Sequence, residues 1–180
     1  MRKRAASSVN ECMIKVDHAG ENGAVNIYRA QKLMAYWRAP QLVANLKETQ
    51  SHEERHRRIF KTYLDKRNIH PCMSYHLCGF GGFVLGFVTG IIGPKAIAAT
   101  TYAVESVVLE HLQTQVDYLK RHDQDALAAV TDIIAEEQEH HDHAEHALQQ
   151  PNLFSKILIR IVRFCTECVI HFGMRTTVRS

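Results

Sequence analysis

The sequence predicts an all-α fold built around a bundle of four long helices, and three observations support this. Apolar residues recur at helical spacing in four stretches, at about residues 9–36, 40–66, 95–122 and 125–148. Each stretch carries a glutamate, or a glutamate and a histidine, in the middle of its apolar stripe. These polar residues recur at a constant offset of 84 positions, as Glu53 and Glu137 show.

The composition is that of an ordinary globular protein and argues against some functions. The 180 residues are 46% hydrophobic and 23% charged, which suits one domain with a real core. A net charge of +3, with no basic run interleaved with aromatic residues, argues against nucleic-acid binding. Residues 1–8 are basic but precede no apolar run, so we expect neither a secretory signal nor a full transit peptide. Five cysteines without a framework spacing predict free thiols.

Proline and the apolar periodicity set the boundaries of the four predicted helices. The first, residues 9–36, ends before Pro40 because proline disfavours helix in the residue that precedes it. The second, residues 40–66, begins with that proline, which suits a first helical turn. The third spans residues 95–122, and the fourth spans residues 125–148 as one continuous helix.

Two of the helices carry the motif Glu-x-x-His. A glutamate and a histidine three residues apart project from the same helix face, so both can reach one metal ion. The two copies of the motif lie 84 residues apart, and the other two helices carry one glutamate each at the same offset. The six predicted metal ligands are Glu21, Glu53, His56, Glu105, Glu137 and His140.

This pattern is the ligand set of di-iron or di-manganese four-helix bundles. The sequence therefore predicts a single ferritin-like domain, made of two repeats at about residues 9–66 and 95–148, with a di-iron centre. A carboxylate inside an apolar core is costly unless it is paired or binds a metal, and four glutamates balance two ferrous ions. Metal-bound histidines usually donate their second N–H to a carboxylate, for which Asp17 and Glu136 are the candidates.

A glycine-rich segment without charged residues joins the two repeats. Between Arg67 and Lys95 there is no Asp, Glu, Lys or Arg, and Gly82, Gly86 and Gly90 fall four apart. Such a face of small residues lets a second helix approach closely. The segment is long enough to span a membrane, but one span would put the two halves of the metal site on opposite sides. We therefore expect a buried or membrane-lying helix at about residues 70–94.

The C-terminal segment predicts an amphipathic helix at about residues 152–174. Lys156, Arg160 and Arg163 recur at three- or four-residue steps, and apolar residues fill the positions between them. A basic stripe on an apolar helix is typical of helices that lie on a membrane surface. A fifth helix packed on the bundle is the alternative, and both descriptions are compatible.

Residues 52–56 also match the His-Glu-x-x-His motif of zinc metalloproteases, in which the glutamate is the general base. The second repeat has Glu136 at the position equivalent to His52, so the repeat preserves Glu-x-x-His alone. A protease would leave Glu21, Glu105 and the second repeat without a role. The zinc protease therefore remains a minor alternative.

The residues around the ligands resemble those of the demethoxyubiquinone hydroxylases, the di-iron monooxygenases of ubiquinone biosynthesis. The resemblance covers nearly the whole chain and rests on Asp-His-Ala-Gly-Glu at residues 17–21, both Glu-x-x-His motifs, Val104–Glu105 and residues 137–142. It implies hydroxylation of the ring of a demethoxyubiquinol with dioxygen and two iron ions per chain. It also implies that Glu53 and Glu137 bridge the irons, that Glu21 and Glu105 are terminal, and that each histidine holds one iron.

The same resemblance implies partners and a cellular location. The substrate is a polyprenylated quinol, so we expect a peripheral protein on the cytoplasmic face of a bacterial inner membrane or the matrix face of the mitochondrial one. NADH or a quinol would be the reductant, and a lipid-presenting protein and a ubiquinone-biosynthesis complex would be partners. Two other functions stay open: a ferritin-like protein for iron storage or peroxide scavenging, and a membrane-associated structural bundle.

Overall fold

The computed structural model describes residues 3–178, with side chains described as far as Arg175, and its helices confirm the predicted all-α fold. The only strand-like pairing among these residues is an isolated bridge between Arg4 and Ile69. The elements are α1 (Val9–Arg38), the 3₁₀ turn η1 (Pro40–Leu42), α2 (Val43–Lys66), α3 (Tyr75–Ile92), α4 (Pro94–Leu119), α5 (Gln124–Thr131), α6 (Ile134–Leu148) and α7 (Leu153–Val178).

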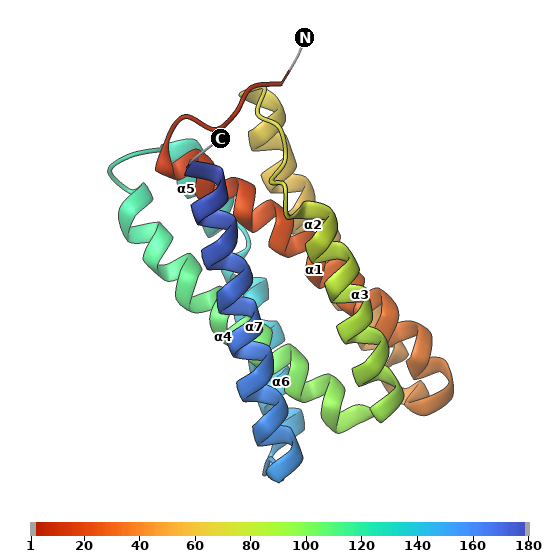
Figure 1. Cartoon of the computed structure of the whole chain (residues 1–180). Coiled ribbons are helices and arrows are strands. Elements are labelled where there is room, and N and C mark those ends of the chain that lie inside the picture. The colour runs from red at the N-terminus through yellow and green to blue at the C-terminus, as the bar shows by residue number, and fades with distance from the viewer. Residues whose placement is uncertain (1–2, 179–180) are drawn as a thin grey trace.

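The helices are arranged in layers (Figure 1). α1 and α4 lie in the middle; α2 packs on α1, and α6 packs on α4. α3 also packs on α1, and α7 packs on α4 and α1, so both cover the side of the molecule that faces the viewer in Figure 1. The four-helix bundle thus consists of α1, α2, α4 and the pair α5–α6, with α3 and α7 added to one side.

α3 runs along α1 at very short distance because its facing residues are glycines. A Cβ atom built at Gly82 would lie 2.3 Å from the carbonyl oxygen of Gly23, and one at Gly86 would lie 2.2 Å from that of Ile27. Both neighbours are backbone atoms, so α3 could accommodate a side chain there only by moving away from α1. The glycine spacing therefore serves close helix packing, as the sequence indicated.

The fourth predicted helix is not continuous, and this part of the prediction was wrong. It is divided into α5 and α6 at Asp132–Ile133. In a continuous α-helix the amide of Glu136 would donate to the carbonyl of Asp132. Here it donates to the carbonyl of Ile133 at 3.1 Å, and the carbonyl of Asp132 accepts a 3.1 Å hydrogen bond from the guanidinium of Arg55 in α2. A side chain that enters the backbone ladder in this way interrupts a helix, and here it comes from a distant part of the sequence.

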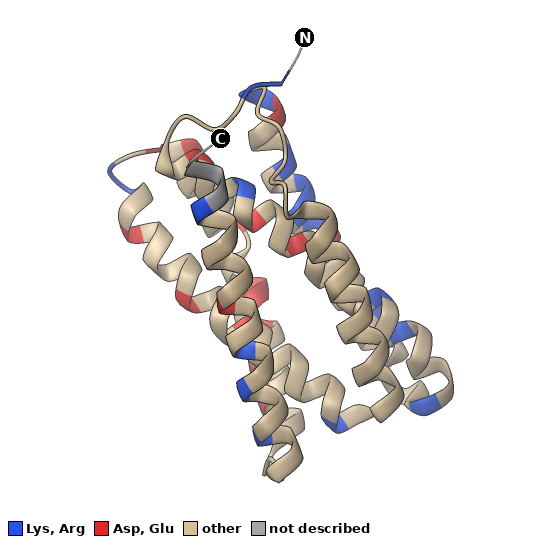
Figure 2. Cartoon of the chain, viewed as in Figure 1, with Lys and Arg blue, Asp and Glu red and all other residues tan. Residues whose placement is uncertain are grey.

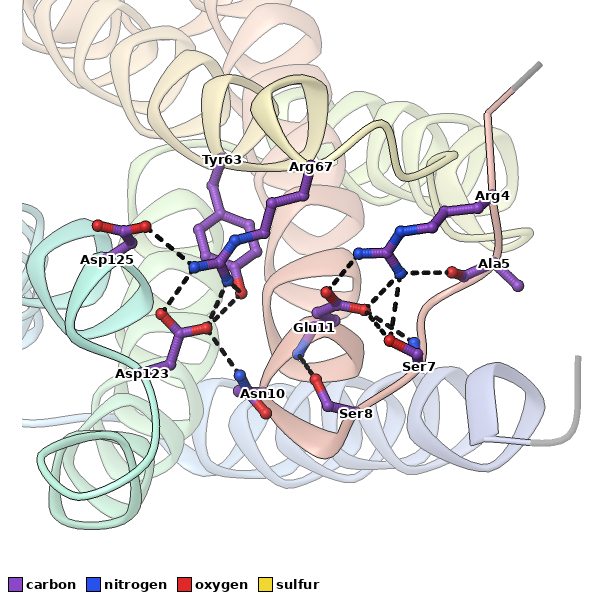
Figure 3. Close-up of polar contacts among 10 residues, drawn as sticks. All are labelled: Arg4, Ala5, Ser7, Ser8, Asn10, Glu11, Tyr63, Arg67, Asp123 and Asp125. Atoms are coloured by element: carbon purple, nitrogen blue, oxygen red, sulfur yellow. Dashed lines mark hydrogen bonds and ion pairs between the residues drawn. The ribbon is translucent and has the colours of Figure 1, made fainter. Parts of the chain in front are cut away.

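A polar network ties the bundle together at the end where α2 stops and α5 starts (Figure 3). Asp123 accepts hydrogen bonds at 2.7 Å from both Tyr63 and Asn10, and its carboxylate pairs with the guanidinium of Arg67. The same carboxylate caps α5 by accepting from the amide of Ala126 at 3.0 Å. Although burial opposes ionisation, these donors hold the pKa of Asp123 well below its usual range. One carboxylate thereby joins α1, α2 and α5.

A second ion pair fixes the N-terminal segment beside this network (Figure 3). The guanidinium of Arg4 donates two hydrogen bonds to Glu11, at 2.6 and 2.8 Å, and the amide of Ser7 donates another at 2.8 Å. These donors, the Arg4 guanidinium above all, lower the pKa of Glu11 to about 2. Backbone bonds of Arg4 with Asn68 and His70 tie the same segment to the loop after α2.

Candidate metal centre

The six predicted ligands converge in the interior of the bundle. Glu21 lies on α1, Glu105 lies on α4, and the two Glu-x-x-His pairs lie on α2 and α6. All six residues are buried, and none is more than 6% exposed. Such a concentration of acidic side chains in an apolar interior requires compensation by positive charge.

The six residues form two overlapping groups, and in each group the candidate ligand atoms lie within 4.8 Å of one another. Both groups contain Glu53 and Glu137, which lie on α2 and α6 respectively. Two neighbouring ions that share these two carboxylates would account for the overlap. The first group is Glu21, Glu53, His56 and Glu137, and the second is Glu53, Glu105, Glu137 and His140.

Each histidine points one ring nitrogen into the cluster and the other away from it. Nδ1 of His56 lies 2.8 Å from Oε1 of Glu137 and 3.7 Å from Oε2 of Glu21, and Nδ1 of His140 lies 3.2 Å from Oε1 of Glu53. The outward nitrogens are held by other residues. Nδ1 is therefore the atom of each histidine that faces the interior of its own ligand group.

The inward-facing atoms fit a metal pair better than they fit one another. Among the described residues, four of these buried atoms make no hydrogen bond of acceptable geometry, although they lie close together. Buried polar atoms are normally hydrogen-bonded, so such a gathering is suited to bind an ion. Oxygen and imidazole nitrogen donors suit iron, manganese or zinc. The four atoms are Oε1 of Glu53, Nδ1 of His56, Oε2 of Glu137 and Nδ1 of His140.

The carboxyl groups divide into two kinds. Burial, together with the nearby charges of Glu53 and Glu137, raises the pKa of Glu21 and of Glu105 well above the usual range. Burial alone would do the same for Glu53 and Glu137, but their contacts with the two histidines outweigh it and lower both pKa values. Without metal, the environment therefore favours the protonated form of the outer pair, Glu21 and Glu105, and the ionised form of the shared pair, Glu53 and Glu137.

The histidines complete the charge balance. Burial alone would lower their pKa values, but the close approach of the carboxylates of Glu137, Glu53 and, for His56, Glu21 outweighs it. The pKa of His140 rises to about 9, and that of His56 rises further. Two imidazolium groups then face the two shared carboxylates, so the positive charge of the histidines offsets the negative charge of Glu53 and Glu137. Protons occupy the place that metal charge would take.

Tyr28 is a residue of this site that sequence reasoning missed. It lies on α1, is 2% exposed, and its hydroxyl donates a 2.7 Å hydrogen bond to Oε1 of Glu105. Tyr28 follows Glu21 by seven residues, which places both on one helix face, and this spacing was the available signal. A cavity of about 140 Å³ reaches Tyr28 and His140 from the surface near Lys95.

The family model described as "Ubiquinone biosynthesis protein COQ7" matches residues 8–173. The chain belongs to the COQ7 family. A relative from Rhodospirillum rubrum, named 3-demethoxyubiquinol 3-hydroxylase, is 34% identical over 140 residues, which cover 77% of this chain and 66% of that protein. Two mitochondrial relatives named NADPH-dependent 3-demethoxyubiquinone 3-hydroxylase also match. The mouse protein is 31% identical over 168 residues (91% of this chain, 76% of that protein), and the Dictyostelium discoideum protein is 27% identical over 179 residues (97% and 81%).

Glu136 and Asp17 were the two residues predicted to accept a hydrogen bond from the ligand histidines. In this COQ7 chain only Glu136 contacts one of these histidines. Oε2 of Glu136 lies 2.8 Å from the outward Nε2 of His56, in the arrangement expected for a ligand's partner. Asp17 instead accepts a 2.9 Å hydrogen bond from Gln115. His111 of α4 contacts Glu167 of α7 at 3.0 Å.

His52, the first histidine of the protease-like motif, does not act as that motif requires. Among the described residues, no group of possible metal ligands includes His52; its Nδ1 lies 3.0 Å from Nε2 of His140. α6 also carries a third group of possible metal ligands, which are partly or fully exposed and do not belong to the buried cluster. These residues are His141, Asp142 and Glu145.

Proposed function

We propose that this chain is a di-iron monooxygenase that hydroxylates the ring of a demethoxyubiquinol with dioxygen. Membership of the COQ7 family, with relatives named for this reaction, supports the activity. The observation that carries the proposal is the pair of overlapping ligand groups, since two metal ions with shared carboxylates are what a di-iron oxygenase needs.

In this proposal the two repeats, residues 9–66 and 95–148, are halves of one domain. Glu53 and Glu137 would hold both ions, Glu21 and His56 would complete one site, and Glu105 and His140 would complete the other. The buried position of all six residues supports these assignments. Ferrous iron bound there would supply electrons to dioxygen. The organic ring of the substrate does not react with dioxygen fast enough without such a metal.

The surrounding residues prepare the site for this chemistry. Tyr28 holds Glu105 through the 2.7 Å hydrogen bond and so fixes its free oxygen toward the cluster. Glu21 and Glu105 give up their protons when metal charge replaces them, because only proximity to ionised Glu53 and Glu137 and burial keep them protonated. The apolar walls around these groups exclude water, which strengthens every charge interaction within.

α3 and α7 support a membrane-bound state, since they lie on the same side of the bundle and expose large apolar side chains (Figure 1). Phe80 on α3 and Phe164 on α7 are each 70% exposed. α3 carries no charged residue along its length, whereas basic residues line α7 (Figure 2). Apolar surface framed by basic residues suits an anionic bilayer, where the polyprenyl tail of the substrate resides.

In this proposal α3 lies on the bilayer and does not cross it. α3 is the one helix in the described part of the chain whose length and composition would permit a span, with a mean hydropathy of 1.6 over Tyr75–Ile92. The helices before and after it meet in one interior, so they belong on one side of a membrane. Trp37, 86% exposed at the end of α1 next to the end of α3, suits the lipid headgroup region.

The names of relatives extend the proposal to reductant and location. The mouse and Dictyostelium proteins are named as NADPH-dependent and mitochondrial, and the R. rubrum relative comes from a bacterium. We therefore propose a nicotinamide nucleotide as the electron source. The matrix face of the mitochondrial inner membrane and the cytoplasmic face of a bacterial one are the two candidate locations, with a lipid-presenting protein as partner.

Isotope labelling tests the proposed reaction. The purified chain, loaded with ferrous iron in anaerobic lipid nanodiscs, is given a demethoxyubiquinol and ¹⁸O₂, and the quinone product is analysed by mass spectrometry. We expect one ¹⁸O atom in the ring. Oxidation of iron without a hydroxylated product would overturn the proposal in favour of the storage or peroxide-scavenging function.

Vesicle co-sedimentation tests the membrane face. Arg160→Glu reverses a charge on α7, and Lys47→Glu makes the same change on α2, on the other side of α1. We expect Arg160→Glu to reduce binding to anionic vesicles and Lys47→Glu to leave it near that of the parent. Equal binding by both variants would contradict the orientation.

A further inference from the structure

Each inward-pointing histidine of the metal centre is held from outside by a residue of the opposite repeat. Nε2 of His56 in α2 lies 2.8 Å from Oε2 of Glu136 in α6. Nε2 of His140 in α6 lies 3.0 Å from Nδ1 of His52 in α2. His52 and Glu136 each immediately precede a Glu-x-x-His motif and are 84 residues apart, so they occupy equivalent positions of the repeat.

The contact between His52 and His140 is specific in geometry. The two rings are stacked at 15° with centroids 5.3 Å apart, and the nitrogens that meet are the outward Nε2 of His140 and Nδ1 of His52. A histidine that binds a metal through Nδ1 carries its proton on Nε2 and donates it. His52 must then accept at Nδ1 and carry its own proton on Nε2, which faces away from the contact.

The two outer partners differ in charge, and this makes the two halves of the centre unequal. Glu136 offers a carboxylate, and the guanidinium of Arg55 in turn holds that carboxylate at 3.1 and 3.3 Å. His52 offers an imidazole nitrogen to His140, and this nitrogen lies 3.9 Å from Oε2 of Glu136, beyond hydrogen-bond distance. A carboxylate partner raises the basicity of a metal-bound histidine more than a neutral acceptor does.

We propose that His52 is a positioning residue that holds His140 toward its metal ion as Glu136 holds His56, and that the difference between these partners makes the His56 site the tighter of the two. This inference rests on the metal pair of the proposed function. It assigns a role to the first histidine of the protease-like motif, which neither the ligand set nor the hydroxylation reaction uses.

Metal binding in two single-site backgrounds tests the inference without recourse to activity. Glu21→Ala removes a ligand of the His56 site only, and Glu105→Ala removes a ligand of the His140 site only. Binding of Co²⁺, which does not react with oxygen as ferrous iron does, is followed by its visible absorption against a competing chelator. We expect the remaining site of Glu105→Ala, which contains His56, to bind Co²⁺ more tightly than the remaining site of Glu21→Ala.

His52→Ala is then added to each background. We expect it to weaken Co²⁺ binding about 10–100-fold in Glu21→Ala, where His140 holds the ion, and to change it little in Glu105→Ala. Glu136→Ala should show the reverse dependence. His52→Asn restores an acceptor, since its Oδ1 stands near the place of Nδ1, and should recover most of the affinity. Circular dichroism of each variant verifies that the helices are intact.

An equal effect of His52→Ala in both backgrounds, or no effect in either, would overturn the inference. Equal Co²⁺ affinities of the His52→Ala and His52→Asn variants in the Glu21→Ala background would also overturn it. Failure of the proposed function is a separate result, because a chain that binds two ions unequally but hydroxylates no quinol would leave the inference in place.

Discussion

The hydroxyl of Tyr28 donates a 2.7 Å hydrogen bond to Oε1 of Glu105, 77 residues away in the sequence. Both residues are buried, at 2% and 1% exposure, so neither group has water as an alternative partner. The bond therefore holds one carboxylate of the candidate metal centre in place.

Replacement of Tyr28 by phenylalanine should destabilise the metal-free chain by about 1–3 kcal/mol, the usual cost of a buried polar group that loses its partner. Urea unfolding of the two proteins measures the difference. Tyr36→Phe is the matched control, because Tyr36 lies on the same helix and is 61% exposed. A similar loss in both variants would contradict the role given to Tyr28.

Metal binding should be steeply dependent on pH. In the metal-free chain the pKa values of Glu21, Glu105, His56 and His140 are all raised, which favours their protonated forms, and metal ions must displace these protons. We expect release of about four protons per two ions, and weaker binding as the pH falls from 8 to 6. Indicator-dye measurement of the protons released on Zn²⁺ addition provides the count. A value near zero would contradict the charge states assigned to the interior.

Two glycines of α3 should respond oppositely to alanine. A Cβ at Gly86 would lie 2.2 Å from the backbone oxygen of Ile27, whereas a Cβ at Gly81 meets nothing within 4 Å. Gly86→Ala should therefore cost about 2 kcal/mol or more through forced separation of α3 from α1. Gly81→Ala should be neutral or stabilising by up to about 1 kcal/mol, because alanine is the better helix former. Melting temperatures in detergent compare the two, and equal values would argue against the close packing.

Asp123 should make stability depend on acid pH. Its pKa is depressed in the folded chain, so its contribution is present above the ordinary pKa of about 4 and is lost as the pH falls below it. Asp123→Asn should lower the unfolding free energy at pH 7 by about 2 kcal/mol and by less at pH 3. Asp125→Asn, whose side chain is 79% exposed, should have little effect at either pH. Chemical unfolding measures the free energies at both pH values. The same loss in Asp123→Asn at pH 7 and at pH 3 would contradict the depressed pKa of Asp123.

Much of the architecture was predictable because its signals are local in the sequence. Helical periodicity and Pro40 located α1, α2 and α4 closely, and the spacing of Gly82 and Gly86 indicated the packing face of α3. The break between α5 and α6 was not predictable, because it depends on a hydrogen bond from Arg55 to the carbonyl of Asp132. Such a bond exists only once α2 and α5 have met.

The candidate site divides in the same way. The 84-residue offset can be read directly from the sequence, so the six candidate ligands were predicted together. In the structure they lie in two overlapping groups, which agrees with that pattern. The residues that hold the ligands were harder to find. Glu136 was predicted from the general habit of metal-bound histidines, but the contact of His52 with His140 requires knowledge of which helix faces meet.

Anaerobic iron loading followed by a count of iron per chain tests the central claim most directly. The parent should bind two ferrous ions. Glu53→Ala should lose both, because Glu53 belongs to both ligand groups, whereas Glu21→Ala should retain about one. Glu54→Ala, a neighbour bonded to Gln50 and outside both groups, should still bind two. A parent that binds a single ion, or a Glu53→Ala variant that keeps both, would contradict the shared metal centre.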